Sequence, residues 1–181
     1  FRFLPIILFG MCAEFVESRA KTNRKGYIMK TAIYGAGSLG TVLGAYLAKA
    51  GVDVDLITRN KEHVDALNAG GARIIGTVDM TVPVHALTPD QMTEKYELII
   101  LLTKQLNNVN VLKNLQKNMT DDCIVCTLQN GMPELSVAEV VGEDRTMGCT
   151  VAWGATLHGK GVSELTSEPD SMSFDLGRMN G

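Results

Sequence analysis

The sequence has no excess of basic residues and few aromatic ones. Its 181 residues include 17 Lys and Arg against 20 Asp and Glu, for a net charge of −3, and Trp153 is the only tryptophan. Neither nucleic acid nor an anionic membrane is expected as a partner, because a surface that binds them usually carries a basic stripe. The apolar run Phe3–Met11 is too short to cross a bilayer. With 45% hydrophobic residues, the chain can still build the core of one domain, with or without a tail.

The sequence also has no cysteine pattern typical of a metal or redox site. Its four cysteines are Cys12, Cys123, Cys126 and Cys149. Cys123 and Cys126 have the spacing of a redox or zinc motif, but they lie in an apolar β-type run, where residues three apart point to opposite faces. A second Cys or His pair with ligand spacing is missing from the sequence. We therefore expect buried free thiols in a reducing, cytoplasmic compartment, and no metal site.

The three histidines do not combine with other residues into a Ser/His/Asp set. His63 is expected in a surface helix, His85 near a strand end and His158 in a loop. Each is interpreted as structural or solvated rather than catalytic.

Residues 1–28 differ in character from the rest of the sequence. Met29 and Lys30 open the first expected strand, so we interpret Met29 as the natural start and residues 1–28 as a non-native or disordered extension without function. A signal peptide is the alternative, because Arg2 precedes the apolar run and the small residues Ser18–Ala20 follow it.

Strand-like and helix-like segments alternate from Met29 to about Val141. This alternation predicts an α/β fold, a Rossmann-like doubly wound sheet that is mainly parallel with helices on both faces, within a single domain of residues 29–181. Further short segments are expected as a hairpin, a short helix and three late strands. The expected strands are 29–34, 52–58, 72–76, 80–84, 98–102, 123–128, 146–152, 161–166 and 171–176, and the expected helices are 41–50, 61–69, 89–95, 105–117 and one that begins at Pro133.

A glycine motif directly follows the first expected strand and opens the first expected helix. It reads Gly35-Ala36-Gly37-Ser38-Leu39-Gly40, a Gly-x-Gly-x-x-Gly pattern. The first glycine permits a tight turn, the second lets the backbone approach a pyrophosphate, and the third lets helix and strand pack closely. All six residues are candidates for binding a dinucleotide, with the helix N-terminus supplying N–H donors. The alternative is a purely structural glycine-rich turn.

Arg59 follows the second expected strand. An NAD-binding protein usually has Asp or Glu here to bind the ribose 2′-hydroxyl, whereas this sequence has Thr58 and then Arg59. A guanidinium can bind a 2′-phosphate with two donors. We therefore predict NADP(H) rather than NAD(H), the alternative being a solvated surface charge.

Polar residues also follow the next two expected parallel strands. Lys104 comes after the strand that ends at Leu102, and Asn107 follows one helical turn later. Asn130 comes after the strand that ends at Leu128, where Gly131 permits a left-handed turn. Ligands of doubly wound sheets bind at the carboxyl ends of the strands, so Lys104, Asn107 and Asn130 are candidates for contacting cofactor or substrate. The alternatives are a solvated lysine and an asparagine that serves only the turn.

In these features, the segment Met29–Gly177 resembles the N-terminal, NADPH-binding half of the ketopantoate reductase (2-dehydropantoate 2-reductase) family. The resemblance rests on the order and spacing of Gly35–Gly40, Arg59, Thr103–Lys104, Gln129–Gly131 and Gly159–Val162.

The resemblance implies a reaction and a role for each matched residue. The family reduces 2-dehydropantoate to pantoate with NADPH, on the route to pantothenate and coenzyme A. By position, the three glycines would hold the pyrophosphate and Arg59 the 2′-phosphate. Lys104 and Asn130 would lie near the nicotinamide ribose and the 2-keto acid substrate and support catalysis. Family members often carry Gln at the position of Asn107.

The resemblance also implies a missing half. In the family, a helical C-terminal domain follows and supplies the catalytic lysine, the general acid at the ketone oxygen, whereas this sequence stops at Gly181. The chain is thus expected to be a fragment that binds the cofactor and is inactive alone. The face left bare should expose apolar residues and favour a homo-oligomer. The alternatives are a stand-alone NADPH-binding regulatory module and a reductase of another small 2-keto acid.

Overall fold

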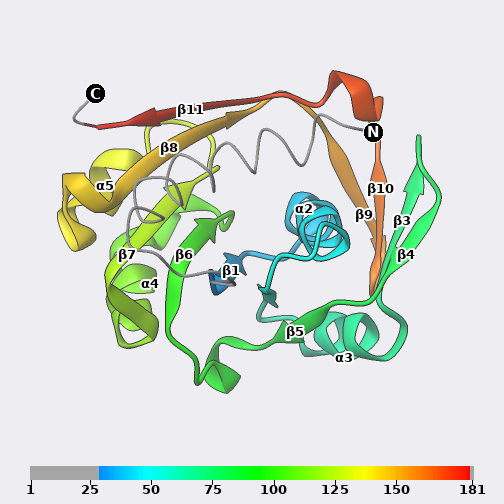
Figure 1. Ribbon diagram of the computed structural model, residues 1–181, viewed down its shortest axis with the longest axis horizontal. Coiled ribbons are helices and arrows are strands. Elements are labelled where there is room, and N and C mark those ends of the chain that lie inside the picture. The colour runs from blue at the N-terminus through cyan, green and yellow to red at the C-terminus, as the bar shows by residue number, and fades with distance from the viewer. Residues whose placement is uncertain (1–28, 180–181) are drawn as a thin grey trace, which may run out of the picture.

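The computed structural model describes residues 29–179, where helices and strands alternate along most of the chain (Figure 1). The predictions about residues 1–28 and about Cys12 concern a segment outside the described residues.

A seven-stranded sheet forms the centre of the fold, in the order β11-β8-β7-β6-β1-β2-β5. All neighbouring strands are parallel except β11, which runs antiparallel to β8. This confirms the predicted Rossmann-like, mainly parallel sheet. The apolar run of β6 is buried with little alternation, as expected of a central parallel strand. The strands are β1 (Thr31–Tyr34), β2 (Val54–Ile57), β5 (His85–Leu87), β6 (Tyr96–Leu101), β7 (Met119–Thr127), β8 (Thr146–Val151) and β11 (Phe174–Arg178).

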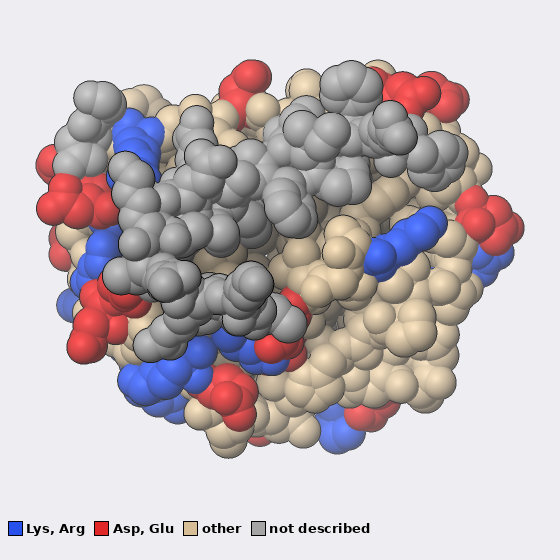
Figure 2. Space-filling model, in the orientation of Figure 1, with Lys and Arg blue, Asp and Glu red and all other residues tan. Residues whose placement is uncertain are grey.

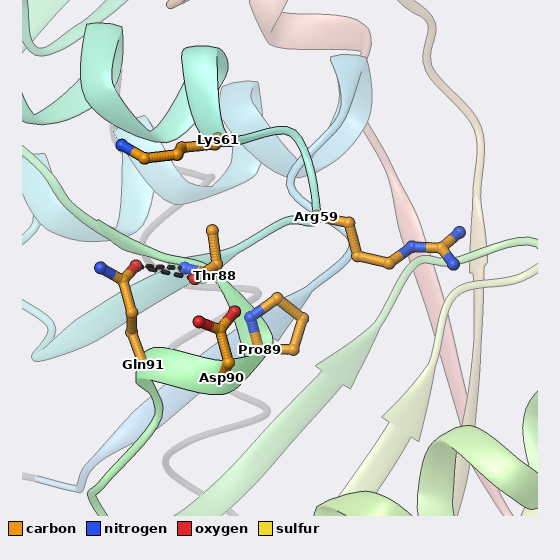
Figure 3. A pocket seen from close by; sticks show the side chains of 6 residues that line it. All are labelled: Arg59, Lys61, Thr88, Pro89, Asp90 and Gln91. Carbon is orange, nitrogen blue, oxygen red and sulfur yellow. Dashed lines mark hydrogen bonds between the residues drawn. The ribbon is translucent and has the colours of Figure 1, made fainter.

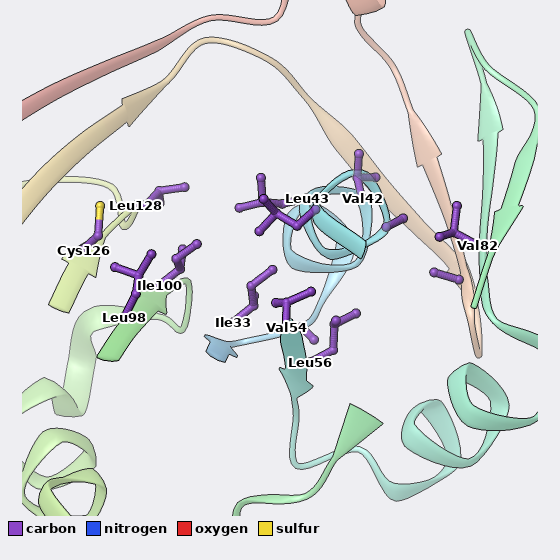
Figure 4. Close-up of a cluster of buried hydrophobic side chains, with 14 of the residues drawn as sticks. Ile33, Val42, Leu43, Val54, Leu56, Val82, Leu98, Ile100, Cys126 and Leu128 are labelled. Atoms are coloured by element: carbon purple, nitrogen blue, oxygen red, sulfur yellow. The ribbon is translucent and has the colours of Figure 1, made fainter. Parts of the chain in front are cut away.

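Helices cover both faces of this sheet and enclose two hydrophobic clusters. On one face, α2 (Ser38–Lys49) packs its apolar side chains on β1, β2 and β6, and Figure 4 shows this cluster. On the other face, α4 (Asn108–Leu115) and α5 (Glu134–Val141) pack on the opposite side chains of β1, β6 and β7. At Gly44, an added Cβ would lie 2.7 Å from Leu56 Cδ1, so a residue without a side chain lets α2 approach the sheet closely.

The cysteines of β7 confirm the predicted alternation of faces. Cys123 belongs to the cluster under α4 and α5, whereas Cys126 belongs to the cluster under α2. Cys123, Cys126 and Cys149 are all buried free thiols. Burial raises the pKa of Cys123 to about 12, so this thiol is protonated at neutral pH.

A second, four-stranded sheet packs on the outer side of α2, in the order β4-β3-β10-β9. The predicted hairpin is confirmed as the antiparallel pair β3 (Ala72–Gly76) and β4 (Met80–Val82). Its extension by β10 (Val162–Leu165), which runs parallel to β3, and by β9 (Ala155–Gly159) was not predicted. Strand β10 itself was expected, whereas the strands β9 and β5 were not. Both missed strands have few buried side chains, so neither leaves a clear apolar pattern in the sequence.

One histidine prediction is wrong in this region. His158 lies in strand β9 rather than in a loop, because the segment pairs antiparallel with β10. His63 lies in the predicted surface helix, α3 (Lys61–Gly70), and is structural, since its own side chain is only 1% exposed. The turn between β9 and β10 covers it, since Gly161 donates its N–H to the His63 ring.

Two predicted helices are shorter than expected. The predicted helix 89–95 is a single 3-10 turn, η1 (Pro89–Gln91), closed by a capping box between Thr88 and Gln91. The predicted helix 105–117 is divided into η2 (Gln105–Asn107), α4 and η3 (Gln116–Asn118), because Asn107 leaves helical geometry with φ −144° and ψ 34°. The other 3-10 turns are η4 (Glu143–Arg145) and η5 (Pro169–Ser171).

Acidic and basic side chains are interspersed on the face of the molecule that Figure 2 shows. Between residues 29 and 179, every helix is too short or too polar to cross a lipid bilayer. The same described residues contain no group of three or more His, Cys, Asp or Glu side chains that could hold a metal ion.

Candidate functional site

The candidate residues follow neighbouring strands of the central sheet. Asn130 follows β7, Lys104 follows β6, the glycine loop follows β1, and Arg59 follows β2. The chain enters the sheet at β1 and then builds outward in both directions, so the glycine loop lies at the topological switch point. Since these strands are parallel, all four groups lie at the same edge of the sheet, in the order Asn130, Lys104, glycine loop, Arg59.

The three motif glycines each meet a different steric requirement. Gly35 has φ +117°, and an added Cβ would lie 2.6 Å from Leu102 C on the neighbouring β6 loop. A Cβ on Gly40 would lie 2.6 Å from Gly35 O, so this glycine lets α2 start close to β1. A Cβ on Gly37 would meet no described atom within 4 Å. Gly35 and Gly40 therefore shape the loop, whereas Gly37 borders open space that a side chain would fill.

The remaining residues of the motif hold this loop against the sheet. The N–H groups of Gly35 and Ala36 both donate to Ile57 O at 2.9 Å, and Ala36 is buried. Leu39 packs its side chain on the core, and α2 begins at Ser38 with Gly37 as its N-cap. Because glycine has no capping side chain and the first turn has no carboxylate, the N-terminal N–H groups of α2 suit an anion. The loop therefore fits a diphosphate group.

Arg59 lines a cavity of about 460 Å³ beyond the carboxyl ends of β2 and β5 (Figure 3). The other lining residues are Lys61, Thr88, Pro89, Asp90 and Gln91. Arg59 is exposed. Burial raises the pKa of Tyr34, and the positive charge of Arg59 acts in the opposite direction without cancelling this effect. Lys61 opens α3 and forms an exposed ion pair with Asp65 at 2.8 Å. The contribution of η1 to this cavity was not predicted, because η1 is distant from Arg59 in the sequence. Lys61 was not predicted either, although it stands only two residues after Arg59.

Lys104 and Asn130 are both exposed at the other end of the edge. Gln129, which directly precedes Asn130, donates from Nε2 to Thr103 O at 2.5 Å, and Thr103 directly precedes Lys104. Gln105, which directly follows Lys104, donates from Nε2 to Asn130 O at 2.7 Å. The structure thus links the two loops that carry the candidate residues. The sequence pattern marks Gln129 only as part of the motif Gln129–Gly131, and it carries no signal for Gln105.

Asn107 makes a side-chain hydrogen bond within its own segment of the chain. It lies at the start of α4, and its side-chain oxygen accepts a hydrogen bond from Asn110 at 2.6 Å. Its neighbour Asn108, 3% exposed, is the residue that contacts the loop after β7, through the side chain of Gln129.

Large apolar side chains are exposed beside Lys104 and Asn130. Leu106 in η2 is 92% exposed, Met132 in the loop after β7 is 75% exposed, and Leu135 in the first turn of α5 is 64% exposed. An apolar surface of this kind is typical of a site that another protein segment or a ligand covers.

The fold and the glycine loop define a Rossmann-like α/β domain with its candidate site at the switch point of the sheet. The family model described as "Ketopantoate reductase PanE/ApbA" matches residues 31–180, and the chain belongs to this family.

Curated relatives with this similarity include 2-dehydropantoate 2-reductases. A 2-dehydropantoate 2-reductase of Pyrococcus abyssi is 36% identical over 143 residues, covering 77% of this chain and 45% of the relative. One from Streptococcus pyogenes serotype M1 is 30% identical over 135 residues, covering 74% of this chain and 44% of the relative. The chain therefore spans about half the length of the curated relatives it matches.

Solved structures agree with the fold. A PanE/ApbA family ketopantoate reductase from Ralstonia eutropha has a TM-score of 0.70 at 26% identity, covering 77% of this chain and 47% of that one. A D-mandelate dehydrogenase, solved with NADH and anilino(oxo)acetate, has a TM-score of 0.73 at 28% identity, covering 82% of this chain and 48% of that one.

Proposed function

We propose that this chain is the NADP(H)-binding domain, residues 29–181, of an enzyme that reduces 2-dehydropantoate to pantoate. The family and the names of the curated relatives support the reaction. The observation that carries the cofactor assignment is the linear order Asn130, Lys104, glycine loop, Arg59 along one sheet edge. An extended dinucleotide has the same order, with a nicotinamide at one end, a diphosphate in the middle and an adenosine 2′-phosphate at the other end.

Each group has a chemical task in this proposal. The glycine loop and the N-terminal N–H groups of α2 bind the diphosphate, since Gly37 leaves open space beside them. Arg59 binds the 2′-phosphate in the cavity that it lines with Lys61. Lys104 attracts the carboxylate of the keto acid, and the amide of Asn130 holds the nicotinamide ribose or the substrate by donating and accepting hydrogen bonds.

The bound nicotinamide would supply hydride to the ketone carbon. The reduction also needs a proton at the ketone oxygen. We assign this proton donor to the part of the relatives' length that the chain does not span, so residues 1–181 alone are expected to bind the cofactor without turnover.

A second candidate function is the reduction of another small 2-keto acid. The D-mandelate dehydrogenase at 28% identity favours it, because mandelate is a 2-hydroxy acid. That neighbour was solved with NADH, so the choice between the two nicotinamide cofactors has to be measured on this chain.

Titration of the chain with NADPH and with NADH, followed by nicotinamide fluorescence, tests the proposal. Tighter binding of NADPH is the expected result. Equal affinity for the two cofactors would reject the role of Arg59, and absence of binding to either would reject the proposed function. An assay with 2-dehydropantoate and bound NADPH tests the expected lack of turnover.

A further inference from the structure

Two glutamines link the loops that follow β6 and β7 in a reciprocal way. Gln129 of the β7 loop donates to the backbone oxygen of Thr103 at 2.5 Å, and Gln105 of the β6 loop donates to the backbone oxygen of Asn130 at 2.7 Å. Lys104 therefore lies in the sequence between Thr103, which accepts one of these bonds, and Gln105, which donates the other. Asn130 lies directly after one donor and provides the acceptor for the other.

The amide of Gln129 is itself held in one orientation. Asn108 Nδ2 donates to Gln129 Oε1 at 2.8 Å, and Gln129 Nε2 donates to Asn108 Oδ1 at 2.9 Å. The hydroxyl of Thr127 donates to the same Oε1 at 3.1 Å. Asn108 is 3% exposed and also donates to Ser136 Oγ at 3.0 Å, so it ties the pair to α5. Because Oε1 accepts from two donors, Nε2 is the atom that faces Thr103.

Gly131 makes room for the second link. It has φ +92°, and a Cβ built on it would lie 2.6 Å from Gln105 Nε2. A side chain at this position would therefore displace the amide that reaches Asn130 O. The sequence Gln129-Asn130-Gly131 thus contains one donor, one candidate ligand-binding residue and one gap for the opposing donor.

We propose that Gln105 and Gln129 are positioning residues that hold Lys104 and Asn130 in a fixed relation at the nicotinamide end of the site. This inference rests on the proposed function. Lys104 and Asn130 are exposed, so contacts of their own side chains do little to order them. Backbone links on both sides of Lys104 reduce the conformational freedom that the two loops would otherwise lose on binding.

The test replaces each glutamine with methionine, which has a similar shape and cannot donate. The probes are NADPH, which spans the whole edge, and adenosine 2′,5′-bisphosphate, which extends from the Arg59 end to the glycine loop and lacks the nicotinamide end. Gln105→Met and Gln129→Met should each weaken NADPH binding about threefold to tenfold, the effect of one lost hydrogen bond. Affinity for adenosine 2′,5′-bisphosphate should stay within about twofold of the parent.

Gln116→Met is the matched control. Gln116 also donates from Nε2 to a backbone oxygen of another element, Val140 O at 3.3 Å, but it lies at the far end of α4. This variant should bind both probes like the parent. The emission of bound NADPH gives a second readout, because a less ordered nicotinamide end should lower its fluorescence enhancement in the Gln105 and Gln129 variants only.

The outcomes separate this inference from the proposed function. If the parent binds NADPH and both glutamine variants bind it as tightly as the parent does, the positioning role is wrong and the proposed function stands. Equal weakening of both probes would indicate a general loss of structure and would also overturn the positioning role. Gln105 is exposed, so Gln105→Met keeps the test valid even if Gln129→Met fails to fold. A parent that binds neither probe rejects the proposed function and the inference with it.

Discussion

His63 Nδ1 accepts a hydrogen bond from the backbone N–H of Gly161 at 3.0 Å, across 98 positions of the sequence. The other ring nitrogen, Nε2, lies 3.0 Å from Thr41 Oγ1. Since Nδ1 accepts, the proton of the neutral ring is on Nε2, which donates to Thr41. One buried imidazole thus joins α3, α2 and the turn between β9 and β10.

Protonation of His63 should destabilise the fold. Burial lowers the pKa of His63 below its ordinary value of 6.5, and a proton on Nδ1 would face the N–H of Gly161. A group with a lowered folded-state pKa of this kind contributes its full stability above pH 6.5. That contribution falls as the pH drops from 6.5 through the folded-state pKa.

Urea unfolding at about pH 7.5 and about pH 5.5 measures this dependence. His63→Gln is the reference, because an amide can both accept and donate without titrating in this range. On lowering the pH from about 7.5 to about 5.5, the free energy of unfolding should decrease less in the variant than in the parent. Identical pH dependence in the two proteins would contradict the role of His63.

His63 also marks where prediction from sequence reached its limit. The period of α3 and its N-cap Asn60 are local signals, so the helix could be predicted. The burial of His63 depends on β9 and β10, which pair with each other and with β3 far along the chain. β9 carries mostly exposed side chains and β5 has only three residues, so neither gives a periodic signal.

The candidate site, like the fold, has a part that could be predicted from the sequence and a part that could not. The residues at strand ends could be predicted, because parallel strands bring their carboxyl ends to one edge and each strand left its own apolar pattern. The links made by Gln105 and Asn108 could not, because they depend on how the loops after β6 and β7 meet in space. Whether Asn107 binds a ligand stays a prediction.

Asp55 should be among the most important polar side chains for stability. It is 1% exposed in β2, and its carboxylate accepts from Tyr96 OH at 2.7 Å and pairs with His85 Nδ1 at 2.7 Å and Lys30 Nζ at 3.2 Å. Burial acts to raise the pKa of Asp55, but the hydrogen bonds from His85, Tyr96 and Lys30 outweigh it and lower the pKa. Asp55→Asn should cost about 3 kcal/mol, since it leaves the buried Tyr96 hydroxyl and the partly exposed Lys30 ammonium without their buried anion.

Asp53→Asn is the matched control for this measurement. Asp53 binds the same ammonium, Lys30 Nζ, at 2.8 Å, but its side chain is 50% exposed. Its loss should change the free energy of unfolding by less than about 1 kcal/mol in urea titrations. Equal effects of the two substitutions would show that burial of Asp55 does not set its importance.

Arg59→Ala should separate the two nicotinamide cofactors. If the guanidinium binds the 2′-phosphate, its loss removes charge-assisted hydrogen bonds and should weaken NADPH binding about tenfold to a hundredfold. NADH has no 2′-phosphate and should bind the variant as it binds the parent. Lys61→Ala, which changes the other cation of the same cavity, shows by comparison how much of the effect belongs to Arg59. Parallel losses for NADPH and NADH would contradict this assignment.

Alanine substitutions at two glycines of the motif should affect different properties of the protein. Gly35→Ala should lower the melting temperature, because Gly35 has φ +117° and the new Cβ would lie 2.6 Å from Leu102 C. Gly37→Ala should leave the melting temperature nearly unchanged, because its Cβ meets no described atom within 4 Å. In the proposed function, that Cβ would instead occupy the space of the bound diphosphate.

NADPH affinity should therefore fall about tenfold or more in Gly37→Ala without a loss of stability. Thermal unfolding and NADPH titration of the same sample measure both properties. A Gly37→Ala protein that is stable and binds NADPH like the parent would remove the diphosphate from the glycine loop. Gly51→Ala supplies the comparison. Gly51 has φ +85° and open space around its Cβ position, and it lies just past the C-terminal end of α2, far from the glycine loop. Stability should fall in this variant, and cofactor affinity should not.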